Sequence, residues 1–182
     1  MADMLTPDML HRLLRYEPET GKLFWRERPV EMFKCERDCN AWNARFAGKE
    51  AFTTTNSDGY KHSQIWARNQ KAHRVIWAMT YGVWPGNIDH IDGDRTHNKL
   101  RNLREATKTQ NAQNKKVHKN NKTGLKGVSL HRKTGKWLAQ IMTGGNGQYL
   151  GLFDTPEEAH EAYCAAAQRL HGEFYNNGTR FL

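Results

Sequence analysis

The stretch Ile88-Asp89-His90-Ile91-Asp92-Gly93-Asp94 places a carboxylate and an imidazole side by side in a short segment that we predict to be the end of a strand. Two amide side chains, Asn102 and Asn111, follow further along the chain. A carboxylate and an amide oxygen suit Mg²⁺, which keeps several waters or substrate oxygens in its shell. Because adjacent side chains on a flat strand point to opposite sides, we expect a break or bulge at the strand end.

These residue types match the needs of phosphodiester hydrolysis. That reaction requires an activated water and relief of negative charge at the phosphate and the leaving oxygen. An imidazole titrates near neutral pH, so His90 fits the general base, while Asp89 and Asn111 fit ligands of Mg²⁺ or Mn²⁺. The alternative is that Asp89 is a plain turn acid and His90 a buried structural histidine.

The charge of the chain favours a polyanionic partner. The 182 residues carry a formal net charge of +9, which attracts nucleic acid or an acidic membrane; the alternative is a merely basic soluble protein. Eight basic residues and one acid lie between Arg101 and Lys126, directly after the polar constellation. At this length the chain forms one domain or two small ones.

Three cysteines, Cys35, Cys39 and Cys164, argue against a disulfide framework. The Cys35–Cys39 pair is a weak zinc pattern because no second pair of ligands accompanies it, and reduced thiols are the alternative we favour. The sequence has no apolar run of membrane-spanning length and no signal-peptide pattern, so a cytoplasmic protein is expected.

The first half of the chain predicts short helices and strands. Thr6-Pro7-Asp8 caps a helix ending near Tyr16, and a strand follows at 23–25. Residues 28–48 are expected to be loop that could hold one short helix. Strands at 51–55 and 60–66 flank an Asn56–Gly59 hairpin turn. A helix around 73–80 should end at Gly82, and the spacing of 100–111 predicts another helix.

The C-terminal part predicts a three-stranded sheet and one helix. Strands are expected at 127–130, 136–141 and 148–153, separated by glycine-bearing turns. Thr155-Pro156-Glu157-Glu158 is a capping box with proline at the first helical position, and Gly172 should end that helix.

The Asp89 segment, with Asn98-Lys99-Leu100, Asn102-Leu103-Arg104, Gln110-Asn111 and the preceding Ala72-His73-Arg74 helix, resembles the HNH endonucleases of the ββα-metal (His-Me finger) group. Residues 50–114 are similar to phage homing-type enzymes of the nicking kind. The resemblance implies that His90 is the general base, that Asp89 and Asn111 bind the metal, and that Asn102 hydrogen-bonds the loop backbone to orient His90.

Neighbouring polar residues have simpler expected roles. We expect Asn98 to brace the loop, with a role at the phosphate as the alternative. We expect His73 to pack near the site on its helix, with substrate contact as the alternative. Asp92 and Asp94 are predicted turn residues that could pair with Arg104.

Residues 124–176 resemble the plant ethylene-response-factor (APETALA-type) DNA-binding domain, through Gly127-Val128, the Gly135–Ile141 strand and Tyr149-Leu150-Gly151-Leu152-Phe153-Asp154-Thr155-Pro156-Glu157-Glu158. In that family the sheet lies in the major groove. Ser129 stands where the plant domains usually have arginine, which removes one Arg–guanine contact. The predicted DNA-binding residues are Arg104, Lys115, Lys116, Lys126, Ser129, His131, Arg132, Lys136, Gln140 and Tyr149.

The sequence therefore predicts an α+β chain: a ββα-metal nuclease core with an N-terminal extension, and a small three-stranded antiparallel sheet packed on one helix. The expected divisions are an extension over 1–49, a nuclease domain over 50–114, a basic linker over 115–123 and a DNA-binding domain over 124–182. The expected function is metal-dependent cleavage of double-stranded DNA, with nicking by a monomer or two-strand cutting by a dimer. A non-catalytic DNA-binding regulator on the same scaffold is the alternative.

Overall fold

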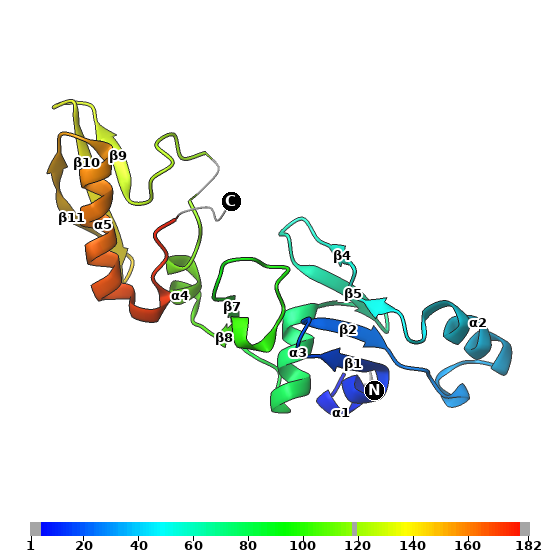
Figure 1. Cartoon of the computed structure of the whole chain (residues 1–182). Helices are drawn as coiled ribbons and strands as arrows, with labels where there is room; N and C mark the ends of the chain where they lie inside the picture. Colours follow the sequence, from blue (N-terminus) through cyan, green and yellow to red (C-terminus); the bar gives the residue numbers. More distant parts are fainter. Residues whose placement is uncertain (1–4, 118–119, 179–182) are drawn as a thin grey trace. The chain divides into compact units, whose positions relative to one another are not determined.

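The chain forms two compact units, Met1–Glu105 and Ala106–Leu182. The computed structural model describes residues 5–117 and 120–178. Helices and small antiparallel sheets are combined in both units, so the predicted α+β class is confirmed (Figure 1).

The first unit begins with helix α1 (Pro7–Leu13), where the Thr6 hydroxyl caps the amide of Met9 as predicted. The prediction that this helix continues to Tyr16 is wrong. Strand β1 (Leu14–Glu17) starts at once and pairs antiparallel with β2 (Lys22–Trp25), so buried Leu14 lies opposite Trp25. Pairing with a neighbouring strand has overridden the helical spacing of the leucines.

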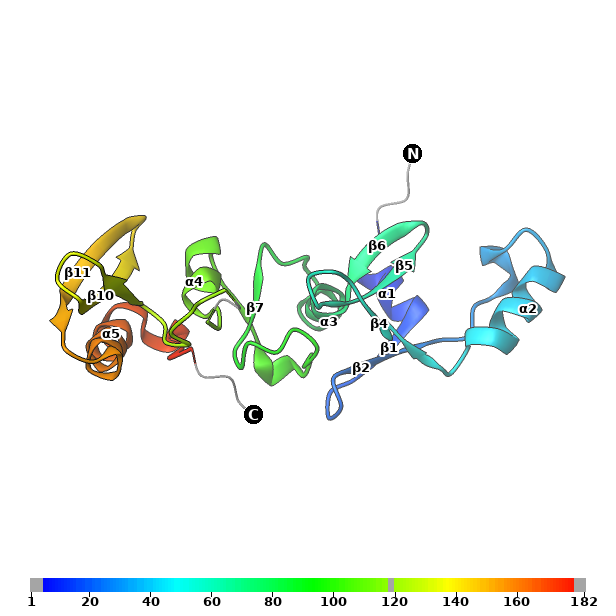
Figure 2. The same cartoon turned by 90° about the horizontal axis from the view of Figure 1, so that it is seen from above.

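The segment expected to be mostly loop contains the 3-10 helix η1 (Val30–Met32) and the helix α2 (Glu36–Phe46). The chain leaves β2, forms α2 and then returns beside β2 (Figure 2). At this return the amide of Gly48 donates to Trp25 O, and the amide of Trp25 donates to Lys49 O. Strand β3 (Glu50–Ala51) then adds to β2 and completes the sheet β1-β2-β3.

The second sheet has the order β4-β5-β6. Its strands are β4 (Thr54–Thr55), β5 (Lys61–Ile65) and β6 (Arg68–Lys71). The predicted 51–55 strand is split between two sheets at Phe52, whose φ of 57° interrupts the extended backbone. The predicted β4–β5 turn is present, with Asn56 Oδ1 accepting from the amide of Tyr60. Strand β6 was not predicted.

Helix α3 (Ala72–Tyr81) confirms the predicted helix and ends at Gly82, whose φ of 72° is readily adopted by glycine. Its buried face packs with α1 and the sheet residues in one core. The core's largest fully buried side chains belong to these elements: Leu10, Leu13, Leu14, Leu23, Ile65, Val75 and Ile76.

After α3 comes β7 (Ile88–His90), which pairs antiparallel with β8 (Leu103–Glu105) after the 3-10 helix η2 (Leu100–Asn102). The prediction of one helix over 100–111 is therefore wrong. Buried Leu103 lies opposite His90 in the ladder, and the helical part, α4 (Lys108–Gln113), begins only after the Thr107 cap.

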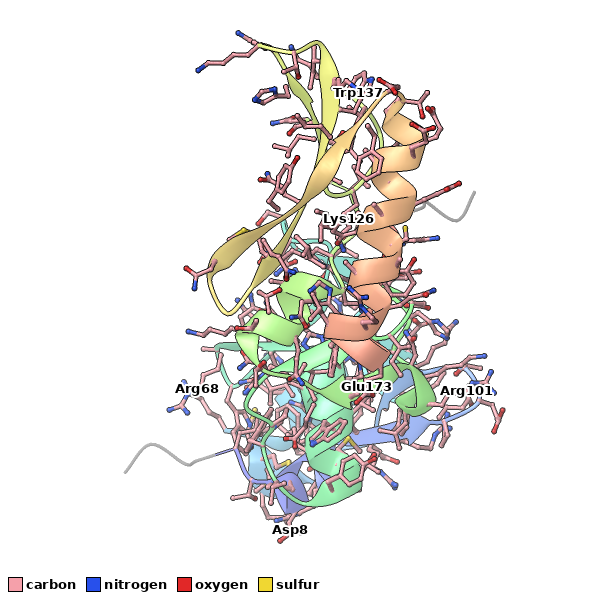
Figure 3. All side chains as sticks on the ribbon, turned by 90° about the vertical axis from the view of Figure 1, so that its left-hand side faces the viewer. Asp8, Arg68, Arg101, Lys126, Trp137 and Glu173 are labelled. Carbon is pink, nitrogen blue, oxygen red and sulfur yellow. The ribbon has the colours of Figure 1, made fainter. Side chains whose placement is uncertain are left out.

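The second unit contains α4 and the sheet β11-β10-β9. The strands β9 (Val128–His131), β10 (Lys136–Thr143) and β11 (Asn146–Phe153) confirm the predicted strands. Helix α5 (Pro156–His171) lies along one face of this sheet, on the side where Trp137 is labelled in Figure 3, and the 3-10 helix η3 (Gly172–Phe174) follows it. The predicted capping box at Thr155 and Glu158 is confirmed.

None of the helices in the described part of the chain is long and apolar enough to cross a membrane.

Candidate active site and nucleic-acid interface

Strand β7 holds Asp89 and His90 as consecutive buried residues, with Asp89 opposite Arg104 and His90 opposite Leu103 in β8. The register is regular here, and the two side chains leave from opposite faces of the ladder. The strand ends at His90, where the amide of Gly93 donates to His90 O at 2.8 Å. The chain turns only after His90, and no break or bulge separates the two residues, so the interruption expected to bring both side chains to one side is not found.

The loop after β7 is closed by Asn102. Its Nδ2 donates to Asp92 Oδ1 at 2.9 Å and to His97 O at 2.8 Å, while its Oδ1 accepts from the amide of Asp92 at 3.1 Å. Burial raises the pKa of Asp92, but hydrogen bonds from His97, the amide of Asp94 and Asn102 outweigh it, so that pKa lies below its usual value. Asp92 pairs with His97, and not with Arg104 as we had expected.

The residue that contacts the His90 ring is Asn98. His90 Nε2 lies 3.0 Å from Asn98 Oδ1, and Asn98 Nδ2 donates to Thr96 O at 3.2 Å. Since the amide oxygen has no proton to give, Nε2 must be the donor. In the neutral ring the lone pair then belongs to Nδ1. Asn98 thus braces the loop and also fixes the tautomer of His90, a role that we had not predicted.

Two further rings surround His90. The His73 ring stands edge-on to it at 5.1 Å between centroids, and the Tyr60 ring lies 5.9 Å away. Burial lowers the pKa of His90, an effect only partly offset by Asn98 and the nearby carboxylates. Burial, with the neighbouring His90, lowers the pKa of His73 to about 3. Both imidazoles are therefore neutral at pH 7, and His90 is in its proton-accepting form.

Asp89 is held by Arg104 across the ladder. Arg104 Nε and one terminal nitrogen donate to Asp89 Oδ2 at 3.0 and 2.8 Å. Sequence reasoning had assigned Arg104 to DNA, but its mostly buried guanidinium is engaged with this carboxylate. Charge-assisted hydrogen bonds of this kind fix the orientation of the carboxylate.

The N-terminal extension supports the loop that carries Asn98. The hydroxyl of Tyr16 donates to Asn98 O at 3.2 Å and accepts from the amide of Leu100 at 2.9 Å. Gly21 lies so close to the same loop that a Cβ there would be 2.6 Å from Lys99 N. The β1–β2 hairpin therefore helps to position Asn98 and, through it, His90.

Asn111, the second predicted metal ligand, lies in α4 and so belongs to the second unit. The first unit brings together Asp89, His90, Asn98 and Asn102, and the part played by Asn111 stays a prediction. Of the two linker lysines, Lys115 is exposed and Lys116 half-buried.

The predicted DNA-contacting residues of the sheet share one face. Lys136 lies opposite His131, and Gln140 lies opposite Tyr149, which is 64% exposed. Ser129 is opposite Leu138, between Lys136 and Gln140 on the same face of β10. The other face carries Trp137, Ala139 and Ile141 and packs on α5, while Arg132 is exposed beyond the end of β9.

Lys126 has a different position from the one expected for a DNA contact. Its ammonium donates to Gln113 O at 2.6 Å, Lys115 O at 2.8 Å and Asn176 O at 3.1 Å. Three carbonyl oxygens satisfy all three ammonium donors. Lys126 therefore joins the end of α4 to the chain that follows η3.

Comparison with known proteins agrees with this geometry. The HNH endonuclease family model matches residues 70–113 and the AP2 domain model matches residues 123–173. The chain belongs to the HNH endonuclease family and also contains an AP2-type DNA-binding domain.

Relatives are found for both parts. "Protein 3.8" of Escherichia phage T7 is 32% identical over 106 residues, covering 57% of this chain and 87% of that protein. "Uncharacterized HNH endonuclease L560" of Acanthamoeba polyphaga mimivirus is 33% identical over 105 residues, 56% of this chain and 54% of that protein. The "AP2-like ethylene-responsive transcription factor ANT" of Arabidopsis thaliana is 45% identical over 49 residues, 26% of this chain and 9% of that protein. No solved structure matches the chain.

Proposed function

We propose that this protein is a divalent-metal-dependent DNA endonuclease of the homing type, with His90 as its general base. The observation that carries the proposal is the contact between His90 Nε2 and Asn98 Oδ1. It holds the ring in one tautomer, and burial keeps the ring neutral, as a base must be before it accepts a proton.

The order β7, β8, α4 supports a ββα-metal core in which Asp89 and Asn111 hold Mg²⁺ or Mn²⁺. The donor set fits such a hard cation, because it consists of carboxylate and amide oxygens and leaves further positions to water and phosphate. The described residues contain no cluster of three His, Cys, Asp or Glu able to hold a metal. An ion held there would neutralise charge at the phosphate and the leaving oxygen.

In the proposed mechanism His90 Nδ1 removes a proton from a water molecule, and the resulting hydroxide attacks phosphorus in line with the 3′-oxygen. The P–O3′ bond breaks, and the departing 3′-oxygen takes a proton from solvent water, giving a 5′-phosphate and a 3′-hydroxyl. Asn98 keeps Nε2 protonated, and Asn102 keeps the loop closed around the ring. Arg104 keeps the Asp89 carboxylate oriented.

In this proposal the second unit binds the DNA duplex. The polar face of the β9-β10-β11 sheet, with Lys136, Gln140 and Tyr149, lies in a groove of duplex DNA, and Lys115 and Lys116 contact phosphates. The division into an extension over 1–49, a nuclease domain over 50–114, a linker over 115–123 and a docking domain over 124–182 is part of the same proposal.

Supercoiled plasmid DNA provides the test. Incubation with Mg²⁺ or Mn²⁺ should convert it to nicked circles, because one catalytic site per chain cuts one strand, and EDTA should prevent this. His90→Ala should lower the rate by about 10²-fold or more while still binding DNA. The matched control is His11→Ala, an exposed histidine of α1. Full activity of His90→Ala would refute the assignment of the general base. If the wild-type protein bound DNA but did not cut it, the result would favour the alternative of a non-catalytic DNA-binding regulator.

A further inference from the structure

Helix α2 holds the backbone of one arginine. The amide of Arg28 donates to Asn43 Oδ1 at 3.0 Å, and Asn43 Nδ2 returns a bond to Arg28 O at 2.9 Å. The thiol of Cys39 donates to the same carbonyl at 3.3 Å. Cys39 is the buried residue of α2, so the buried side of this helix contributes to fixing Arg28.

The guanidinium of Arg28 lies on an aromatic platform. Its carbon is 3.7 Å from the centroid of Trp42 and 5.1 Å from that of Trp25. Within the described part of the chain Arg28 Nε is buried without a hydrogen-bond partner, and the side chain forms no ion pair with a carboxylate. Burial lowers the pKa of Arg28 to about 10, so the group is still charged at neutral pH. A half-buried cation without a counter-ion is only partly solvated, which fits an external anion.

Arg28 lines a hollow of about 320 Å³. Glu50 is the acidic residue in the wall, and its charge is taken up by Lys22 at 2.8 Å and Lys61 at 3.6 Å. The rest of the wall is aromatic on one side and polar on the other: Trp25, Trp42, Phe46, Ala51, Phe52, Thr53, Thr54, His62, Ser63, Gln64 and Trp66. The aromatic side chains of such a wall can stack on a flat ring, and the polar side chains can hydrogen-bond to the polar edge of that ring.

Trp66 reaches this hollow from a strained turn. Ile65 and Arg68 pair, so the β5–β6 hairpin turns on the two residues Trp66 and Ala67, with φ values of 49° and 60°. Such turns favour Asn and Gly because both central residues have positive φ. A tryptophan that is 41% exposed, in a backbone conformation unfavourable for it, suggests a role beyond folding.

We propose that this hollow binds one unstacked nucleotide of DNA, with the base against the tryptophans and the phosphate on the Arg28 guanidinium. Every base offers a face for stacking, and arginine matches phosphate with two parallel donors. The volume is at the lower end for ligand sites, which suits one nucleotide. The inference rests on the proposed function in taking DNA as the partner.

The test is a fluorescence titration of the full chain in EDTA, which blocks cutting. The probes are a single-stranded trinucleotide, a free deoxynucleoside monophosphate and inorganic phosphate. The trinucleotide should bind most tightly and the phosphate most weakly. Arg28→Met and Trp66→Asn should each weaken trinucleotide binding about tenfold or more, whereas Arg37→Met, which removes an exposed cation of α2, should not. If the free monophosphate binds as tightly as the trinucleotide, the site takes soluble nucleotides and the assignment to DNA is wrong.

Trp66→Asn separates a binding role from a structural one. Because asparagine tolerates positive φ, this variant should melt at the same temperature as the wild type or higher while binding more weakly. A lower melting temperature, unchanged trinucleotide affinity in both variants, or equal binding of phosphate and nucleotide would overturn the proposal. A protein that binds the trinucleotide at this hollow but never cuts plasmid would instead overturn the proposed nuclease function alone.

Discussion

Acid should destabilise the first unit through His73, and His73→Phe should remove much of that effect. The His73 ring is 5% exposed, and its Nδ1 is buried with no hydrogen-bond partner among the described residues. Its pKa is lowered to about 3, against about 6.5 in an unfolded chain. Above about pH 6.5 both states are neutral at this residue. As the pH falls below that value only the unfolded state gains the proton, so stability is lost.

The size of the effect follows from linkage. Each pH unit between about 6.5 and 3 costs about 1.4 kcal/mol, so His73 should lower the free energy of unfolding by about 2 kcal/mol between pH 7.5 and 5. Phenylalanine keeps a ring beside Tyr60 and His90 but does not titrate. The acid-induced loss should therefore be about 2 kcal/mol smaller in His73→Phe. The lowered pKa of His90 acts in the same direction and remains in both proteins.

The assay is urea unfolding of the full chain at pH 7.5, 6.5, 5.5 and 5, followed by tryptophan fluorescence. His131→Gln, in the second unit, controls for the loss of a histidine elsewhere. Parallel loss of stability in the wild type and His73→Phe, to within about 0.5 kcal/mol, would show that His73 titrates normally and that its burial has been misjudged.

Three further outcomes are expected. Asn98→Ala should lower the plasmid-nicking rate by at least about tenfold with little change in DNA affinity, because His90 loses the partner of Nε2; equal rates would refute the tautomer argument. Gly127→Ala should destabilise the second unit by about 3 kcal/mol in thermal melts, since its Cβ would overlap the ring of Tyr163 at a φ of 77°. Lys126→Met should cost about 2 kcal/mol by removing the donor from three carbonyls, and an unchanged melting temperature would contradict that role.

The second unit was predictable because its sequence signals are local. The Thr155 capping box and the glycine turns each specify a structure within a few residues, and all three strands and α5 were predicted. The 100–111 segment was mispredicted because its leucine spacing suits a helix, whereas Leu103 pairs with a strand many residues earlier. Helix α2 carries mixed charge and packs on Arg28, a contact that no local pattern reveals.

At the candidate site, the sequence pointed to Asp89, His90, Asn98 and Asn102, since the pattern of residue types is itself distinctive. Which amide contacts which group depends on how the 91–99 loop folds back, and so the Asn98–His90 contact was not predicted. The Asp89–Arg104 pair was missed for a similar reason, because it requires the β7–β8 register. Tyr16 and Tyr60 come from distant segments and carry no motif.

The hydrogen bonds of Lys126 determine which segment of this chain could be transferred intact to another protein. The segment recognised as an AP2 domain, 123–173, contains the lysine but none of the carbonyls it serves, which belong to Gln113, Lys115 and Asn176. A graft that contained only residues 123–173 would leave the half-buried ammonium of Lys126 without these hydrogen-bond acceptors. A swap cut from 106 to 178 keeps donor and acceptors together, and it carries Asn111 along with the β9-β10-β11 sheet.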